Sequence, residues 1–324
     1  MKNILEVNGL KTYFHTFKGV VKAVDDVSFS LKPGEILGLV GESGGGKSVT
    51  GFSLIKLIEE PGKIESGEIL FNGTDIVKLS EREMSGIRGK DIAMIFQDPM
   101  TSLNPVYTVG KQMEEVLVLH QSHLSKQERK ERCIELLKDV GISNPESRLK
   151  NYPHQFSGGM RQRVVIAIAL ACNPKLIIAD EPTTALDVTI QAQILKLMMK
   201  LVKEHNCALI LVTHDLAVVS EVADKINVMY CGKIVETGTR DDIMFNHVHP
   251  YTKGLIGSIP KLDQSQNRLE TIEGIVPNMF QLPKGCNFAP RCKHVDKKCL
   301  EVEPVISEVG KLHHVACHHP KGGA

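Results

Sequence analysis

Short, continuously apolar runs alternate with charged, helix-type stretches along the chain. Three of these runs, at residues 34–40 (GEILGLV), 175–180 (KLIIAD) and 207–213 (CALILVT), have the character of strands buried on both faces of a parallel sheet. Residues 190–202 have a helical pattern and lie between the last two runs. Strands that alternate with helices predict an α/β fold.

Two further segments predict an antiparallel sheet near the N-terminus. Residues 24–31 (VDDVSFSL) alternate apolar and polar positions, and residues 67–73 (GEILFNG) end in an Asn-Gly turn. Between residues 97 and 155 the pattern becomes helical and charged, with an N-cap at Ser125 and a stop at Gly141. We therefore expect a helical insertion in the sheet domain.

After about Tyr251 the periodicity fades and prolines recur, which predicts a second, smaller module. We place the first domain at residues 1–255, with a helical subdomain at about 98–165, and the C-terminal module at residues 256–324. The longest apolar run, residues 164–172, is about half of the ~20 residues that a membrane helix needs. No signal peptide is visible at the N-terminus, so we expect a chain that does not span a bilayer and works in a reducing compartment.

Composition narrows the function classes. Of 324 residues, 42% are hydrophobic and 24% charged, which is ordinary for a globular protein. The net charge is +1, with 5% aromatic residues and no tryptophan, so neither phosphate attraction nor base stacking favours a nucleic-acid partner.

A glycine-rich segment follows the first apolar run directly. Residues 41–48 read GESGGGKS, which fits the pattern G-x-x-x-x-G-K-S/T of phosphate-binding loops. Lys47 can reach the β and γ oxygens of a nucleotide, the Ser48 hydroxyl can bind Mg²⁺, and the helix expected next directs its positive end at the phosphates. The candidate nucleotide-binding residues are Gly41, Glu42, Ser43, Gly44, Gly45, Gly46, Lys47, Ser48 and Val49.

An acidic pair closes the apolar run KLIIAD. A carboxylate at a strand end can hold Mg²⁺, often through water, which makes Asp180 a candidate magnesium ligand. The adjacent Glu181 can polarise an attacking water as a general base. Beside the glycine-rich loop, this pair predicts hydrolysis of a nucleoside triphosphate.

Residues 156–162 read FSGGMRQ, which resembles the signature loop of ABC ATPases, usually written LSGGQ. The sequence departs from that pattern at Phe156 and Met160. A serine and two glycines that open a helix form an anion site. In the family this loop closes on the γ-phosphate of the ATP bound by the other subunit. The resemblance implies that role here for Ser157, Gly158, Gly159 and Met160.

Three more positions match family motifs in the same order along the chain. Gln97 matches the Q-loop glutamine that senses Mg²⁺ and water, Asp187 in Ala185-Leu186-Asp187 matches the D-loop that crosses the dimer, and His214 matches the H-loop histidine. The resemblance implies Glu181, His214 and Gln97 as catalytic residues, and Ser48, Gln97 and Asp180 around Mg²⁺. It implies a P-loop NTPase fold with a RecA-like core, an antiparallel β-subdomain and a helical subdomain.

Tyr13 and Phe14 are the candidates for the aromatic residue that stacks on adenine in this family. Counting back from Ala23 and Val24 favours Phe14. The alternative is an ordinary packed aromatic side chain at the surface.

Residues 97–109 (QDPMTSLNPVYTV) and 152–163 (YPHQFSGGMRQR) resemble the ATP-binding subunits of prokaryotic dipeptide/oligopeptide and nickel importers. Residues 285–292 (GCNFAPRC) agree, so the resemblance covers nearly the whole chain. It implies a peripheral motor at the cytoplasmic face of the membrane. Its expected partners are an identical or paralogous ATPase subunit, two permease subunits contacted near residues 100–108, and an extracytoplasmic peptide-binding protein.

Four of the eight cysteines crowd the C-terminal module with the spacing C-x5-C-x6-C-x17-C. These are Cys286, Cys292, Cys299 and Cys317. The long gaps suit a cubane cluster better than the paired C-x2-C ligands of zinc fingers, and members of the resembling branch are thought to hold a [4Fe–4S] cluster. We expect [4Fe–4S], with zinc or unligated and oxidised thiols as alternatives. The nearby His313, His314, His318 and His319 could supply ligands or tune the site, but we expect them to be solvated.

Three other functions stay open at this point. The first is an ABC ATPase for nickel or another small solute. The second is a non-transport ABC ATPase that acts on ribosomes or DNA, although such proteins generally carry two nucleotide domains or long coiled-coil insertions. The third is a metal or redox sensor with a vestigial ATPase, against which Glu181 and His214 argue.

Overall fold

The computed structural model describes residues 2–184, 186–259 and 271–320. Its contacts divide the chain into two compact units, each interrupted along the sequence. The first unit comprises Met1–Ile4, Lys32–Glu35 and Lys78–Ile210, and the second comprises Leu5–Leu31, Ile36–Val77 and Leu211–Ala324. The predicted division at residue 255 follows neither unit and stays a prediction.

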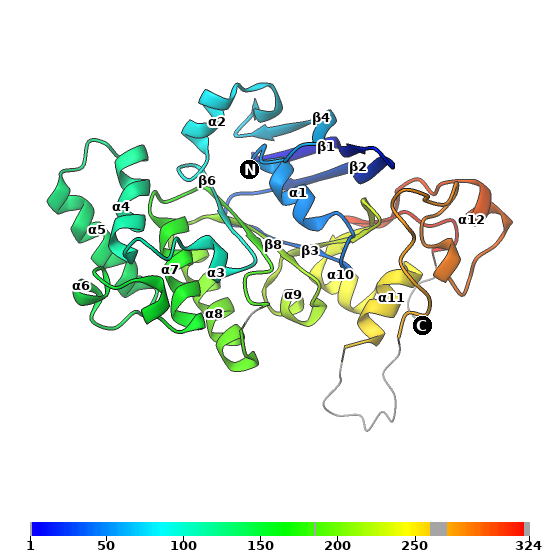
Figure 1. Cartoon of the computed structure of the whole chain (residues 1–324). Helices are drawn as coiled ribbons and strands as arrows, with labels where there is room; N and C mark the ends of the chain where they lie inside the picture. Colours follow the sequence, from blue (N-terminus) through cyan, green and yellow to red (C-terminus); the bar gives the residue numbers. More distant parts are fainter. Residues whose placement is uncertain (1, 185, 260–270, 321–324) are drawn as a thin grey trace. The chain divides into compact units, whose positions relative to one another are not determined.

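The first unit contains two parallel strands and a group of helices (Figure 1). Strand β6 (Ile92–Ile95) pairs with β7 (Leu176–Asp180), and helix α7 (Gly158–Leu170) packs against β6. Around α7 lie the helices of the expected insertion, drawn in green. The helices of this unit are α2 (Glu81–Ile87), α3 (Pro99–Ser102), α4 (Val109–His120), α5 (Lys126–Asp139), α6 (Pro145–Arg148), α7, α8 (Val188–Glu204) and the 3-10 turn η2 (Pro153–Gln155).

Local sequence explains where these helices begin. The Ser125 hydroxyl accepts from the N–H of Glu128, and the Glu128 carboxylate accepts from the N–H of Ser125, which is the reciprocal capping box. Leu136 and Leu137 then place one face of α5 in the core. The predicted helix at residues 125–141 is therefore confirmed.

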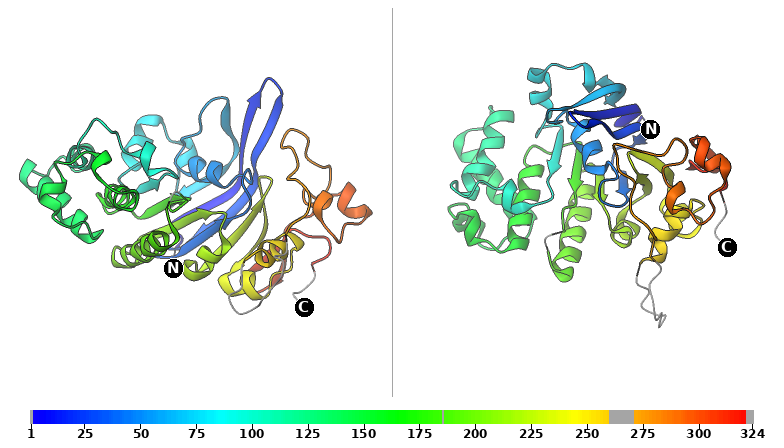
Figure 2. Two further views of the ribbon diagram at one scale, coloured as in Figure 1. Left: turned by 60° about the horizontal axis from the view of Figure 1, so that its bottom comes forward. Right: turned by 45° about the vertical axis from the view of Figure 1, so that its right-hand side comes forward.

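The second unit contains an antiparallel sheet in the order β2-β1-β4-β5. Figure 2 shows β1 and β2, in blue, as one long hairpin. The predicted strands at residues 24–31 and 67–73 lie within β2 and largely within β4, which confirms the antiparallel sheet. The strands are β1 (Leu5–Thr16), β2 (Gly19–Leu31), β4 (Gly62–Phe71) and β5 (Thr74–Asp75), with the 3-10 turn η1 (Ile76–Lys78) after them.

A second series of strands in this unit follows the order β11-β12-β10-β9-β3. Strand β3 (Ile36–Val40) is buried at every position and runs parallel to β9 (Lys225–Tyr230), as its apolar run predicts. The outer strands are antiparallel, and the last two come from the C-terminal region. They are β10 (Lys233–Thr239), β11 (Ser307–Gly310) and β12 (His313–Val315).

Short helices complete the second unit. Strand β8 (Ala208–Thr213), the third predicted apolar run, crosses from the first unit into the second. Among the described residues, none of the helices combines the length and apolar character that crossing a membrane requires. The helices of the second unit are α1 (Lys47–Leu54), α9 (Leu216–Val222), α10 (Arg240–Phe245), α11 (Pro250–Gly257), α12 (Lys297–Glu301) and the 3-10 turn η3 (Ala289–Arg291).

The packing of β3 against α9 gives a stability prediction. A Cβ added at Gly38 would lie 2.2 Å from Cγ1 of the buried Val219, whose β-branched side chain has little freedom to move. Gly38→Ala should therefore lower the free energy of unfolding by about 1–3 kcal/mol, measured by denaturant titration.

Gly86→Ala is the matched control. Gly86 lies inside α2, and a Cβ added there would have nothing within 4 Å, so an alanine should stabilise the protein by about 0.5–1 kcal/mol. Equal unfolding free energies for Gly38→Ala and the wild type would contradict the packing described for β3 and α9.

Candidate functional site

The phosphate-binding loop lies between β3 and α1, in the predicted strand–loop–helix context. Gly46 caps α1 with a left-handed backbone (φ of 96°), and the Thr50 N–H donates to the Gly46 carbonyl at 2.9 Å. Ser43 and Gly44 are exposed at the crest of the loop, whereas Lys47 is buried. The loop therefore presents its crest outward and keeps its cation inside.

Two glycines are required because the loop passes very close to other backbone segments. At Gly41, with φ of 151°, an added Cβ would lie 2.1 Å from the carbonyl oxygen of Met229. At Gly46 it would lie 2.2 Å from the carbonyl oxygen of Ala23. The end of β9 and the middle of β2 thus fix the shape of the loop.

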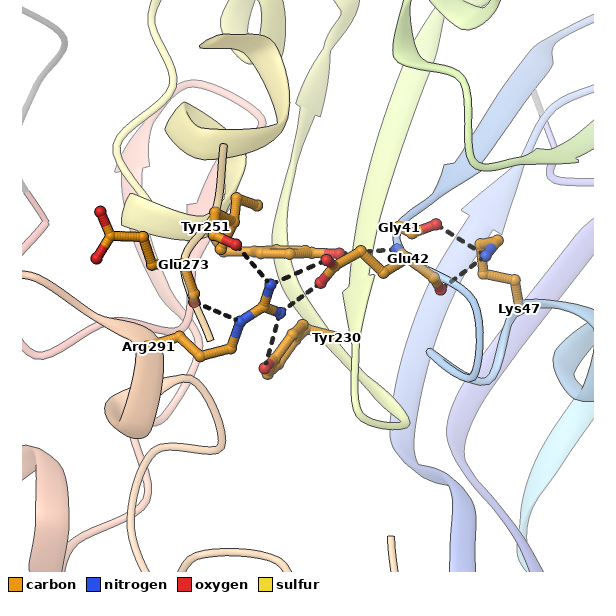
Figure 3. Close-up of polar contacts among 8 residues, drawn as sticks. Gly41, Glu42, Lys47, Tyr230, Tyr251, Glu273 and Arg291 are labelled. Carbon is orange, nitrogen blue, oxygen red and sulfur yellow. Dashed lines mark hydrogen bonds and ion pairs between the residues drawn. The ribbon is translucent and has the colours of Figure 1, made fainter. Parts of the chain in front are cut away.

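Lys47 lies at the centre of this loop. Its ammonium donates to the carbonyl oxygens of Gly41 at 2.8 Å and Glu42 at 3.0 Å (Figure 3). No side chain of the described residues caps the first turn of α1, so its positive end faces the loop. A glycine cradle, a buried lysine and an uncapped helix end fit a nucleotide phosphate. Ser48 and Val49, half-buried in the first turn, follow directly.

The acidic pair lies at the end of β7, in the first unit. Asp180 is its last residue and is buried, while Glu181 has a left-handed backbone with φ of 44°. Such a conformation costs about 1–3 kcal/mol in a non-glycine residue and persists where the surroundings enforce it.

The Glu181 carboxylate meets the predicted Q-loop residue. Its Oε2 accepts from Gln97 Nε2 at 3.0 Å and from the Thr184 hydroxyl at 2.9 Å. The structure therefore brings together two of the predicted catalytic side chains, which lie 84 residues apart in the sequence. Thr184 is an addition that the sequence reasoning missed.

The signature residues begin α7, as an anion site at a helix end requires. The exposed Ser157 caps α7, because its hydroxyl accepts from the Met160 N–H at 3.3 Å. Gly158 and Gly159 follow, and an added Cβ at Gly159 would lie 2.7 Å from Cγ2 of Ile190 in α8. The phenylalanine that replaces the family's leucine, Phe156, is buried.

The predicted D-loop aspartate is a helix cap. Asp187 Oδ1 accepts from the Ile190 N–H at 3.0 Å at the start of α8. Ala185 of the same motif lies outside the described residues. The packing of α7 and α8 places the signature and D-loop segments beside each other within the first unit.

His214 follows β8 directly and is exposed. The next residue, Asp215, caps α9 by accepting from the N–H groups of Ala217 and Val218. The histidine is thus held between a strand end and a capped helix start, with its ring accessible to a ligand.

Tyr13 and Phe14 have different surroundings on β1. The Tyr13 hydroxyl donates to Asp25 at 2.5 Å, and burial together with this carboxylate raises the pKa of Tyr13. The Phe14 ring packs beside Gly62, where an added Cβ would come within 2.5 Å of it. The choice of Phe14 as the adenine-stacking residue stays a prediction.

The four C-terminal cysteines line one pocket of the second unit. Burial raises the pKa of the Cys286 thiol to about 11 and also raises the pKa values of Cys299 and Cys317. Among the described residues, however, the ligand atoms that converge within 4.8 Å belong to Asp296, Cys299 and His319 rather than to four thiolates.

One of the nearby histidines contradicts the expectation from the sequence. His313 is buried and its Nε2 lies 2.9 Å from the buried Glu236 carboxylate, so it is not solvated. His319 bonds to Asp296 at 2.7 Å. The sequence carries no signal for the buried partner of His313.

A second group of residues around the phosphate loop was also missed. The Arg291 guanidinium, from η3, binds the Glu42 carboxylate at 2.6 and 3.0 Å, and the Tyr251 hydroxyl accepts from the Glu42 N–H at 2.8 Å (Figure 3). The segment GCNFAPRC served in the sequence analysis for its family resemblance and its cysteines, and no role was predicted for Arg291. The basic residue before Cys292 was the available signal, but nothing in the sequence indicates its partner.

Comparisons with known proteins agree with this arrangement. Residues 24–184 match the family described as ABC transporter, and residues 235–299 match the one described as oligopeptide/dipeptide transporter, C-terminal region. The chain belongs to the ABC transporter ATPases, in the branch with the oligopeptide/dipeptide C-terminal region.

Similar proteins cover nearly the full length. The chain is 52% identical to the oligopeptide transport ATP-binding protein AppD of Bacillus subtilis, over 94% of this chain and 93% of that protein. It is 50% identical to the dipeptide transport ATP-binding protein DppD of Haemophilus influenzae, over 98% and 96%. The dimeric ATP-binding cassette MJ0796 with ADP and Pi aligns with a TM-score of 0.65 and 29% identity, covering 73% of this chain and 98% of that structure.

The predicted [4Fe–4S] cluster is wrong. The family and relatives are ATP-binding transport proteins of which an iron–sulfur cluster is not a feature. The prediction used sequence gaps, which do not determine where thiols point, and Cys299 lies beside Asp296 and His319 instead. The zinc alternative gains no support from the matched proteins.

The contacts of Lys47 predict a binding defect. Lys47→Ala removes the charge that would bind the nucleotide phosphates, and the affinity for ATP should fall about tenfold to a hundredfold, because charge-assisted hydrogen bonds contribute about 1.5–3 kcal/mol. Equilibrium titration with a fluorescent ATP analogue measures it.

Lys63→Ala, on the exposed side of β4, is the control that removes a cation elsewhere in the same unit. Wild-type ATP affinity in Lys47→Ala would count against the phosphate-loop assignment.

Proposed function

We propose that this chain binds Mg-ATP and hydrolyses it as one motor subunit of an ABC importer for dipeptides or oligopeptides. The observation that carries the proposal is the glycine cradle around Lys47 in a chain whose full-length relatives are peptide transport ATP-binding proteins. The nucleotide-binding residues are those of the loop from Gly41 to Val49, with Phe14 at the adenine.

Each residue of the site has a chemical role in this proposal. Lys47 and the first turn of α1 bind the β- and γ-phosphates. Glu181 accepts the proton of the attacking water. Gln97 and Thr184 orient this water indirectly, through the hydrogen bonds that they donate to the Glu181 carboxylate. The water oxygen bonds to the γ-phosphorus while the bond between that phosphorus and the bridging oxygen breaks, giving ADP and phosphate.

Mg²⁺, held by Ser48, Gln97 and Asp180, would neutralise charge on the phosphate oxygens. The hydroxyl, amide and buried carboxylate offer the oxygen ligands that this ion prefers. His214 is proposed to donate a hydrogen bond to the γ-phosphate, which its exposed position after β8 allows.

The anion site at the start of α7 suits a phosphate from another subunit. We assign Ser157, Gly158, Gly159 and Met160 to the ATP bound by a second ATPase subunit, with Asp187 crossing the same interface. The dimeric cassette structure supports this use of two copies. The partner is an identical or a paralogous subunit.

The remaining partners follow from the proposal that the chain powers an importer. Two permease subunits contact residues near 100–108, an extracytoplasmic binding protein delivers the peptide, and the motor lies at the cytoplasmic face of a prokaryotic membrane. The C-terminal module at residues 256–324 belongs to this branch, as the matched C-terminal region supports. Nucleic acid has no role.

Other functions have less support. A nickel or other small-solute transporter, or a non-transport ABC ATPase, would share the ATP site, but the relatives AppD and DppD are named for peptides. A redox sensor with a vestigial ATPase is disfavoured by the contact between Gln97 and Glu181.

Removing the proposed base separates binding from turnover. Glu181→Gln keeps the size and the hydrogen bonds of the side chain but cannot take a proton, so ATP should bind and the dimer should close while hydrolysis nearly stops. Phosphate release and size-exclusion chromatography with Mg-ATP measure the two effects. Glu204→Gln, at the exposed end of α8, should hydrolyse ATP normally, and unchanged hydrolysis by Glu181→Gln would refute its role.

The cargo is tested in cells. Deleting this chain should abolish uptake of a labelled dipeptide or oligopeptide, the wild type should restore it, and Glu181→Gln should not, because transport needs turnover. Uptake of labelled nickel is measured in the same strains. Loss of nickel uptake with intact peptide uptake would overturn the peptide assignment and leave the ATPase assignment standing.

A further inference from the structure

The C-terminal region that the comparison matched, residues 235–299, contacts the phosphate loop through an ion pair within the second unit. Arg291, at the end of η3, donates from Nη1 to Glu42 Oε2 at 2.6 Å and from Nη2 to Glu42 Oε1 at 3.0 Å, across 249 residues of sequence (Figure 3). Parallel two-bond contact between a guanidinium and a carboxylate fixes both position and orientation. A surface ion pair with one exposed lysine would do neither.

The remaining donors of Arg291 are also engaged. Nε donates to the Glu273 carbonyl at 3.1 Å, Nη1 to the Tyr230 hydroxyl at 3.3 Å, and Nη2 to the Ile272 carbonyl at 3.3 Å. The Arg291 side chain is only 3% exposed, and its guanidinium lies near the rings of Tyr230 and Phe288. The cation is therefore held in the orientation that meets Glu42 by Ile272 and Glu273 of its own region and by Tyr230 of β9.

Glu42 belongs to the phosphate loop and is held from two sides. Its carboxylate meets Arg291, and its N–H donates to the hydroxyl of the buried Tyr251 at 2.8 Å. Its carbonyl oxygen in turn accepts from the Lys47 ammonium at 3.0 Å. The residue that Arg291 holds is thus the one that helps to place the phosphate-binding lysine.

Charge gives Arg291 a second effect on the loop. Glu42 places a carboxylate within the loop that must accept a highly anionic nucleotide. An uncompensated negative charge there would repel the phosphates. The Glu42 hydrogen bonds raise the pKa of Arg291, so the guanidinium remains cationic and compensates the carboxylate at every pH of interest.

We propose that Arg291 is a positioning residue for ATP binding, through which the C-terminal region holds Glu42 and the phosphate loop in the binding shape. This inference rests on the proposed ATPase function. The C-terminal region is then part of the nucleotide site and not only an attachment to it.

The experiment uses the assembled transporter in proteoliposomes, with its permease and partner subunits. ATP hydrolysis is measured against ATP concentration for the wild type, Arg291→Gln, Arg291→Lys and Lys293→Gln, beside thermal unfolding of each purified chain. Arg291→Gln should raise the KM for ATP about tenfold or more, with a smaller effect on kcat, because coupling of this kind is typically about 5- to 150-fold. Lys293→Gln removes an exposed cation two residues away and should keep the wild-type KM.

Rescue separates positioning from a general loss of structure. Arg291→Lys restores the charge but not the two-bond contact, so it should recover part of the lost affinity. In Glu42→Gln, which lacks the carboxylate, adding Arg291→Gln should raise the KM much less than it does in the wild type. A wild-type KM in Arg291→Gln, full recovery in Arg291→Lys, or fully multiplicative effects of the two substitutions would each overturn the inference.

The two proposals fail differently. If the wild-type complex does not hydrolyse ATP, the proposed function is wrong. If it does so with a measurable KM that Arg291→Gln leaves unchanged, only the role of Arg291 is wrong.

Discussion

The phosphate loop depends on a close approach between backbone segments that excludes any side chain. The carbonyl oxygens of Met229 and Ala23 lie where a Cβ of Gly41 or Gly46 would be. Because these carbonyls belong to β9 and β2, the loop takes its shape from strands of both sheets in the second unit. Lys47 can then fold back onto the carbonyls of Gly41 and Glu42, and α1 begins with its N–H groups facing the same space. The glycines, the lysine and the helix start therefore form one site.

Much of this arrangement was predictable because it is local in the sequence. The continuous apolar runs predicted β3, β7 and β8, and Ser125 predicted the start of α5. The spacing of GESGGGKS predicted a strand, a loop and a helix in that order, which the structure confirms. These features follow from neighbouring residues, whose hydrogen bonds and burial repeat with the period of a strand or a helix.

The features that the sequence did not predict depend on contacts between distant residues and on the directions in which side chains point. No periodicity links Arg291 to Glu42, or His313 to Glu236, because each pair forms only when separate segments fold together. The cysteines show the opposite error, since their spacing predicts four converging thiolates. In the folded chain, Asp296 accepts from the Cys299 N–H and binds His319. The surroundings of the Cys299 thiol therefore include Asp296 and His319, which the spacing of the cysteines does not take into account.

The end of the chain also completes the sheet. Strand β12 pairs with β10, placing Val315 opposite Glu236, and His313 reaches the Glu236 carboxylate, which is fully buried and also accepts from the N–H groups of Val248 and His249. A protein truncated before β11 would leave β10 as an open edge with unpaired N–H and C=O groups, and the buried Glu236 side chain without its histidine partner. Such a shortened protein would tend to self-associate, so a tag or fusion partner is better attached after residue 320 than in place of the last strands.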